Sequence, residues 1–163
     1  MALQLAKELN RPWELARAGI RTNFELIEVA FNRFNALHAS DNIETLSLVI
    51  DDGGGVLTTG VKGFIFVPVA STITAIRVLS VDGAATAGSA VLDLWRNTYA
   101  NYPPIVDNSI VASAKPTLVS TNKYQDTTLT GWTKTMATSD IIAVNLDSVS
   151  TFTRLLVLLT VAR

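Results

Sequence analysis

The side chains that most often act as bases, nucleophiles and metal ligands are scarce in this sequence. His38 is the only histidine, and none of the 163 residues is a cysteine. No acid, serine or lysine stands in an obvious catalytic relay with His38. Without cysteine there is no disulfide, thiol nucleophile or thiolate metal ligand. Three copies of His38 meeting at a trimer axis are one way to hold an ion, but a buried or capping histidine is the simpler interpretation. We therefore expect no metal site.

The carboxylates and glycines also fall short of a catalytic pattern. The run that begins at Asp51–Gly53 resembles the start of a calcium loop, but the acidic ligands that should follow are missing, so a turn is predicted. Glycosidases need two carboxylates facing one cleft, and Asp93, flanked by Leu92 and Leu94, is the only acid in the middle of a predicted strand. Neither a lysine nor a helix follows Gly55, which argues against a phosphate loop. We expect no enzyme and no cofactor.

Aromatic side chains in the second half of the chain have two interpretations. Sugars stack on aromatic faces, so Tyr99, Tyr102 and Tyr124 are candidate glycan contacts. In the alternative interpretation, Trp95 and Trp132 fill the protein core while Tyr99 and Tyr102 fix a long loop in place.

The composition indicates one domain of ordinary size, or a smaller domain with an appendage. Hydrophobic residues make up 48% of the chain and charged residues 17%, with a net charge of −1. A near-neutral chain has no overall attraction to nucleic acid or to an anionic membrane. The longest apolar run is only the length of a strand, and the first residues lack the pattern of a secretory signal. We therefore expect no nucleic-acid partner, no membrane insertion and synthesis in the cytoplasm.

The acidic residues divide the chain into two parts near Ile43. Four of the five acids before Ile43 are Glu, which favours helices, whereas Glu44 is the only Glu from Ile43 onward. Thr and Val concentrate in the second part, as expected of strands. We predict a helical N-terminal segment over residues 1–42 and a β-sandwich over residues 43–163.

The pattern of residues 1–42 predicts a helix with one apolar seam. Asn10 and Pro12 are typical of a helix start, and Thr22 with Glu25 has capping-box spacing, which predicts a second start after Gly19. Apolar residues then recur every 3.5 residues on average, the repeat of a coiled coil. These candidate oligomerisation or docking residues are Ile20, Phe24, Ile27, Phe31, Phe34 and His38. The seam fits a coiled coil, a helix packed on its own sandwich, or a helix docked on another protein.

The second part predicts an antiparallel β-sandwich of jelly-roll type. Short segments rich in β-branched residues alternate with turn signals. The expected strands are Thr45–Ile50, Lys62–Val69, Thr72–Ser80, Ser89–Arg96, Thr117–Ser120, Thr127–Trp132, Ile141–Leu146 and Thr151–Val161. A turn is expected at Asp147-Ser148, between the last two. The final strand is apolar on both faces, so it should be central in its sheet or covered by a neighbouring subunit.

A set of motifs resembles a β-sandwich domain found near the C-termini of many bacteriophage virion proteins of the tail or fibre class. The motifs cover about three quarters of the chain. They are Thr58–Gly63, Val91–Pro104, Asp107–Ile110, Lys115–Leu118, Gln125–Trp132, Asn145–Ser148 and Thr153-Arg154. The resemblance implies a structural role in the virion and no catalytic residues.

Taken together, these features predict a non-enzymatic phage virion protein. We expect a capsid decoration protein or head fibre, because 163 residues are few for a tail fibre that spans a long gap. The alternatives are a small tail-fibre or tail-adaptor subunit and a receptor-binding module for a host surface glycan. The expected partners are other capsid or tail proteins, and the low charge and apolar seam predict a homotrimer.

Overall fold

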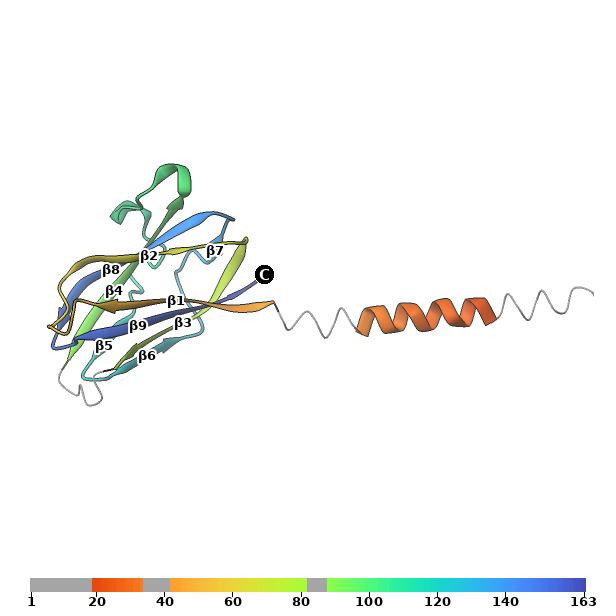
Figure 1. Cartoon of the computed structure of the whole chain (residues 1–163), viewed down its shortest axis with the longest axis horizontal. Coiled ribbons are helices and arrows are strands. Elements are labelled where there is room, and N and C mark those ends of the chain that lie inside the picture. The colour runs from red at the N-terminus through yellow and green to blue at the C-terminus, as the bar shows by residue number, and fades with distance from the viewer. Residues whose placement is uncertain (1–18, 34–41, 82–87) are drawn as a thin grey trace, which may run out of the picture. The chain divides into compact units, whose positions relative to one another are not determined.

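The computed structural model describes residues 19–33, 42–81 and 88–163. The chain divides into two compact units, Met1–Asn42 and Ile43–Arg163. The second unit holds every strand of the described residues, and the first contributes one helix. The mainly β architecture with a helical N-terminal segment confirms the predicted fold class (Figure 1).

The N-terminal unit is helical without interruption over residues 19–33. The predicted helix start at Thr22 is therefore wrong, because Gly19 already belongs to the helix. A glycine inside a helix costs only about 1 kcal/mol relative to alanine, which the rest of a regular helix readily offsets. The predicted start at Asn10, and the seam residues Phe34 and His38, lie outside the described residues.

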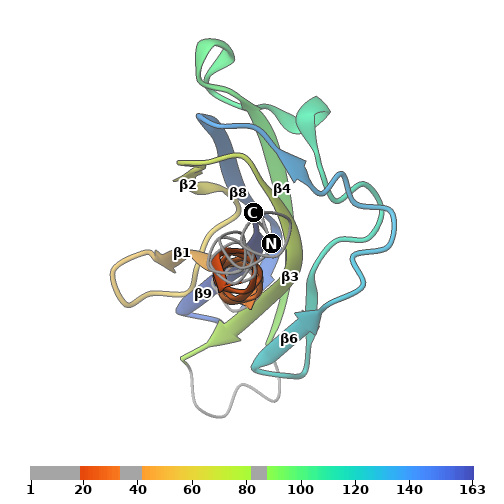
Figure 2. The same ribbon diagram turned by 90° about the vertical axis from the view of Figure 1, so that its right-hand side faces the viewer.

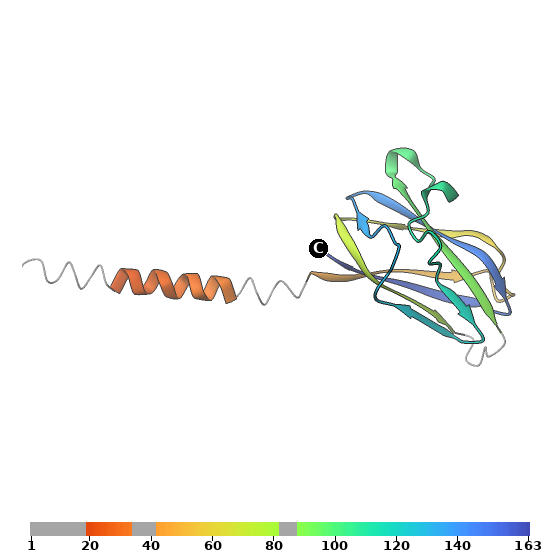
Figure 3. The ribbon, with the colours of Figure 1, turned by 180° about the vertical axis from the view of Figure 1, so that it is seen from behind.

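The C-terminal unit consists of two antiparallel sheets. The first sheet contains, in spatial order, β1 (Ile43–Asp51), β9 (Arg154–Ala162), β3 (Ser71–Ser80) and β6 (Lys123–Asp126), with the short β7 (Thr135–Met136) also paired to β3. The second contains β2 (Gly60–Phe66), β8 (Asp140–Ser150), β4 (Ser89–Thr98) and β5 (Thr117–Val119). Figure 2 views the sandwich from the end where β1 begins and β9 finishes, and Figure 3 shows it from behind.

The order of pairing makes this sandwich a jelly roll. The first strand pairs with the last (β1 with β9), the second with the next to last (β2 with β8), and the pattern continues inward to β3 with β6 and β4 with β5. One long antiparallel hairpin has in effect been wrapped into two sheets. Ile43 lies opposite Ala162, so the chain enters the sandwich beside the strand in which it ends.

The core lies between the two sheets and is built from alternate residues of the strands. Leu92 and Leu94 of β4 and Ile142 and Val144 of β8 point into it, and all four are fully buried. Each such side chain stabilises the fold by roughly 1.5–3 kcal/mol. β9 is central in its sheet, as its two apolar faces predicted: Leu155, Val157 and Leu159 are buried, while its outer face is half-buried.

In the second half, one predicted strand is wrong and one observed strand was not predicted. Thr127–Trp132 was expected to be a strand, but the neighbouring residues Lys123–Asp126 form β6 and a turn follows it. The Asp126 carboxylate accepts hydrogen bonds from the backbone N–H groups of Thr128 and Leu129, which fixes that turn. The two-residue strand β7 was not expected, because so short a run carries no periodic signal.

The turn expected at Asp147-Ser148 is also absent, since β8 runs through it to Ser150. Val91 of β4 lies opposite Ser148 and Leu92 lies opposite Leu146, so Asp147 is an extra residue in β8. This is a β-bulge, which turns one side chain away from the regular alternation. The actual turn between β8 and β9 occupies residues 151–153, with Phe152 fully buried.

Candidate functional site

Four residues of the predicted seam lie on the described helix and have large apolar side chains. Ile20, Phe24, Ile27 and Phe31 are each more than half exposed. At 100° per residue these four lie within one narrow stripe of the helix. Leu26 and Val29 are also exposed, but they lie on the opposite side of the helix.

A chain segment beside β4 is held by an ionic network around the buried Asp93, whose partners Lys115 and Asp147 are partly exposed. Asp93 is 1% exposed, and its carboxylate accepts a hydrogen bond of 2.7 Å from the Ser109 hydroxyl and pairs with Lys115 Nζ at 2.9 Å. Lys115 also pairs with Asp147 at 2.5 Å, and this bond, with that to Asp93, raises the pKa of the lysine. Asp93, the one acid expected in the middle of a strand, is thus a hydrogen-bonded residue of β4. All the ionic groups are satisfied by one another, so the network is structural.

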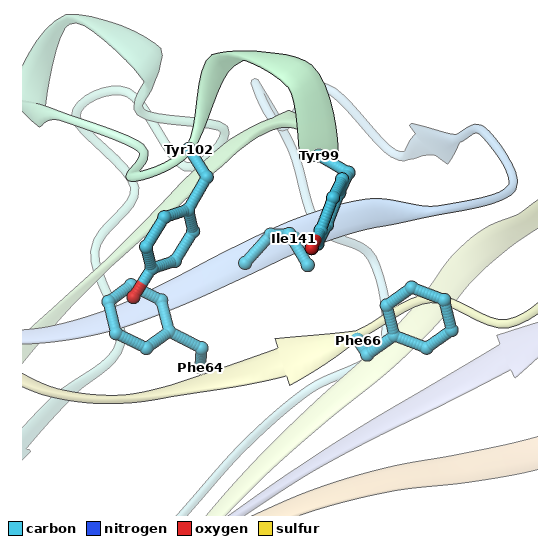
Figure 4. A pocket seen from close by; sticks show the side chains of 5 residues that line it. All are labelled: Phe64, Phe66, Tyr99, Tyr102 and Ile141. Carbon is cyan, nitrogen blue, oxygen red and sulfur yellow. The ribbon is translucent and has the colours of Figure 1, made fainter.

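After β4 the chain forms two short 3-10 turns, η1 (Tyr99–Asn101) and η2 (Val106–Asn108). The turn η1 brings Tyr99 and Tyr102 over the outer face of β8 toward β2 (Figure 4). There they line a pocket of about 500 Å³ together with Phe64, Phe66 and Ile141. Figure 4 shows the ring of Tyr102 close to Phe64, and the two ring centroids are 5.0 Å apart with the planes inclined by 59°.

The third predicted glycan contact, Tyr124, lies elsewhere. It belongs to β6 in the other sheet and lines a separate pocket of about 310 Å³ with Arg77, Leu79, Lys123 and Gln125. Burial raises the pKa of Tyr124, and the negative charge of Asp126 raises it further. The predicted trio is thus divided: two tyrosines converge and the third does not join them.

The two tryptophans differ in position. Trp132 lies in the core, and its indole Nε1 donates a 3.0 Å hydrogen bond to the carbonyl oxygen of Ala114. Trp95 is opposite Ala143 of β8 and points to the outer face, where it is half-buried. The interpretation that Trp95 fills the sandwich is therefore wrong. Side chains alternate between the two faces of a strand. Because Leu92 and Leu94 of β4 point into the core, Trp95 points to the outer face.

The two aspartates at the end of β1 form ion pairs with basic side chains of the same domain. Asp52 pairs with Lys62 at 2.8 Å and accepts hydrogen bonds from the backbone and hydroxyl of Thr58, and these contacts lower its pKa to about 2. Asp51 accepts a hydrogen bond from the Gly53 N–H and pairs with Arg154, which lowers its pKa as well. In the described ranges no cluster of three or more metal-ligating side chains occurs, and no described helix is long and apolar enough to cross a membrane.

Sequence reasoning missed Phe64, Phe66 and Ile141. Phe64 and Phe66 alternate with the buried Ile65 on β2, a signal that two rings face outward. What brings them near Tyr99 and Tyr102 is the strand order β2-β8-β4, which pairs Phe66 with Ile141. That order is a tertiary property that spacing alone does not reveal.

No family model and no curated protein matches the chain. Among solved structures, the CBM32 of AlyQ in complex with 4,5-unsaturated mannuronic acid is 13% identical, covering 71% of this chain and 75% of that one, with a TM-score of 0.36. The capsid asymmetric unit of cyanophage Pam1 is 14% identical, with coverages of 74% and 84% and a TM-score of 0.24. A structure of infectious bursal disease virus, Gx strain, is 10% identical, with coverages of 74% and 35% and a TM-score of 0.23. Likenesses this weak carry no inference about function.

Proposed function

We propose that this chain is a non-enzymatic structural protein of a bacteriophage particle. In this proposal the N-terminal helical segment attaches and assembles the protein, and the jelly roll is the domain that it carries. The observation that carries the proposal is the exposed seam of Ile20, Phe24, Ile27 and Phe31 on a helix joined to a sandwich with its own core. Four such side chains gain roughly 1.5–3 kcal/mol each when a partner covers them.

The sandwich supports the same proposal in two ways. Jelly rolls are a common architecture of viral capsid and lectin domains. The motifs that resemble phage virion domains fall on structural features: Asp93 and Lys115 belong to the ionic network, and Trp132 belongs to the core. Such residues stabilise the fold. Motifs made of stabilising residues are expected of a structural domain more than of a catalytic one.

Assembly is proposed to be a homotrimer formed along the helical seam. A seam with a 3.5-residue repeat favours a bundle of parallel helices. One short helix is marginal in isolation, so the seam needs sister helices or another virion protein to be stable. Within the virion, a capsid decoration protein or head fibre is our first assignment, and a tail-fibre or tail-adaptor subunit is the second.

Quantitative mass spectrometry of purified particles, with heads and tails separated, tests the proposal. A decoration protein should be found in the head fraction, with roughly hundreds of copies per particle. A tail subunit should be found in the tail fraction, with about a dozen copies per particle. The absence of the chain from both fractions would contradict the virion assignment.

A further inference from the structure

We propose that the pocket formed by β2, β8 and η1 is a carbohydrate-binding site that takes a neutral sugar ring. The lining residues are Phe64, Phe66, Tyr99, Tyr102 and Ile141, and the volume is about 500 Å³. That volume lies within the range of small-molecule sites. The inference is independent of the virion assignment, because it rests on the geometry of this pocket alone.

The pocket is an open aromatic shelf. Tyr99 is 71% exposed, and Phe66 and Tyr102 are each 53% exposed. A wholly apolar ligand would bury only one side on so open a shelf, and its remaining apolar surface would stay in contact with water. A pyranose ring suits the shelf better, since one face carries C–H groups that pack on aromatic rings while its hydroxyl groups remain solvated at the rim.

The polarity of the shelf favours a neutral ligand. None of the five lining side chains carries a charge, so an ionic group would lose water there without gaining a partner. The hydroxyl groups of Tyr99 and Tyr102 have no hydrogen-bond partner among the residues that the structure describes, which leaves both available to sugar hydroxyls. Aromatic packing would thus set the position of the ring, and the phenol hydroxyls its orientation.

Side-chain hydrogen bonds hold the turn that carries Tyr99 and the turn η2 that follows it. In η2 the Asn108 side-chain oxygen accepts hydrogen bonds from the Ile105 N–H at 3.0 Å and from Asn97 Nδ2, at the end of β4, at 3.2 Å. Asn101 Nδ2 also donates to the Thr98 hydroxyl at 3.2 Å, which ties η1 to the end of β4. A preorganised platform lowers the entropy cost of binding.

Tyr124 provides a matched control because it lies on the other sheet, in a pocket with Arg77 and Lys123. The test uses the full chain and a printed array of neutral mono- and disaccharides. It is followed by saturation-transfer NMR with the methyl glycosides of glucose, galactose and N-acetylglucosamine. The wild-type protein should bind at least one array sugar and transfer saturation to the C–H protons of one ring face. Tyr99→Ala and Tyr102→Ala should each weaken binding by about tenfold, and Tyr124→Ala should leave it unchanged.

Melting temperature and oligomeric state are measured for each variant alongside binding. A loss of binding is attributed to the pocket when the melting temperature is unchanged. If Tyr99→Ala lowers the melting temperature, Tyr99→Phe takes its place: it keeps the ring and loses only the hydroxyl, so it should bind more weakly than the wild type and more tightly than Tyr99→Ala. Failure of the wild-type protein to bind any sugar on the array overturns the proposal, as does equal loss in Tyr124→Ala. If Tyr99→Ala instead dissociates an oligomer, the pocket is a contact between copies of the chain.

Discussion

Trp132 donates its indole N–H to Ala114 from inside the core, whereas Trp95 lies half-buried on the outer face. The Nε1 atom of Trp95 is itself buried and has no hydrogen-bond partner within the described part of the chain. A buried donor without a partner loses its hydration and gains nothing in exchange. Two residues of one type in one domain therefore contribute differently to stability.

Replacing each tryptophan by phenylalanine should separate these two contributions. Trp132→Phe should lower the free energy of unfolding by about 1–3 kcal/mol, since it leaves the Ala114 carbonyl oxygen without its donor and shrinks a core side chain. Trp95→Phe should leave the free energy of unfolding unchanged or raise it by about 1 kcal/mol, because it removes the unpaired donor. Urea denaturation measures both. A larger loss in Trp95→Phe than in Trp132→Phe would mean that their environments are reversed.

Asp52 should make the domain sensitive to acid. Its pKa is about 2 in the folded protein against an ordinary value of 3.8, chiefly because Lys62 donates a hydrogen bond to it. A lowered folded pKa gives stability that is present above about pH 4 and is lost as the pH falls toward about 2. Asp52→Asn should therefore flatten the fall in the free energy of unfolding over that window.

Urea titrations at a series of pH values measure this effect. Asp107→Asn is the control, because Asp107 is exposed and takes part in no ion pair within the described residues. Asp51 keeps its own contact with Arg154, so some acid sensitivity should remain in Asp52→Asn. Identical pH profiles for wild type and Asp52→Asn would show that the Lys62 contact does not contribute.

At the scale of elements, periodicity located most strands but missed features fixed by side-chain contacts. Alternation predicted β3 and β4 closely, because β-branched and apolar residues repeat every second position there. The strand expected at Thr127–Trp132 failed because the Asp126 carboxylate caps a turn. The bulge at Asp147 was predicted as a turn because an Asp-Ser pair is common in turns. The ion pair between Asp147 and Lys115 was not predictable, because the two residues are far apart in the sequence.

The candidate site was predictable only in part. Tyr99 and Tyr102 are three residues apart, so one short turn brings them together. Their apolar neighbours come from β2 and β8, and only strand order reveals that proximity. Tyr124 was grouped with them by residue type alone, which does not determine position.

The helical seam makes a prediction about assembly. Phe24→Ser together with Phe31→Ser should reduce the proposed homotrimer to a monomer, because both side chains lie on the seam and each would be buried between helices. Leu26→Ser with Val29→Ser is the matched control, since it removes exposed apolar area from the opposite side of the helix. Light scattering at micromolar concentration reports the mass. A monomeric wild-type protein, or equal effects of the two double variants, would contradict a coiled coil.

The same variants distinguish the three roles that the sequence left open for the helix. Loss of the trimer alone indicates a coiled coil, and loss of the sandwich fold indicates a helix that packs on its own domain. Loss of particle binding with an intact trimer indicates a docking helix. Circular dichroism, light scattering and co-sedimentation with particles measure the three properties separately. If all three survive, the helix has no structural role.

At the scale of the whole molecule, the sandwich should fold without the helical segment. Its core lies wholly between two sheets of the unit Ile43–Arg163, and β1 begins at the first residue of that unit. A chain that begins at Ile43 should therefore melt within a few degrees of the full-length protein, and it should be monomeric and fail to bind the particle. Calorimetry and co-sedimentation measure these outcomes. An unfolded or aggregated product would show that the two parts are not independent.

Attachment of this jelly roll to a virus particle through the helix is tested most directly by a cryo-electron microscopy map of intact particles that contain this protein. The map should contain jelly rolls with the strand orders β1-β9-β3-β6 and β2-β8-β4-β5, grouped about threefold axes. The seam of Ile20, Phe24, Ile27 and Phe31 should be covered by sister helices or by another virion protein. A particle that lacks the jelly roll, or one in which the seam faces solvent and the sandwich makes every contact, would contradict the claim.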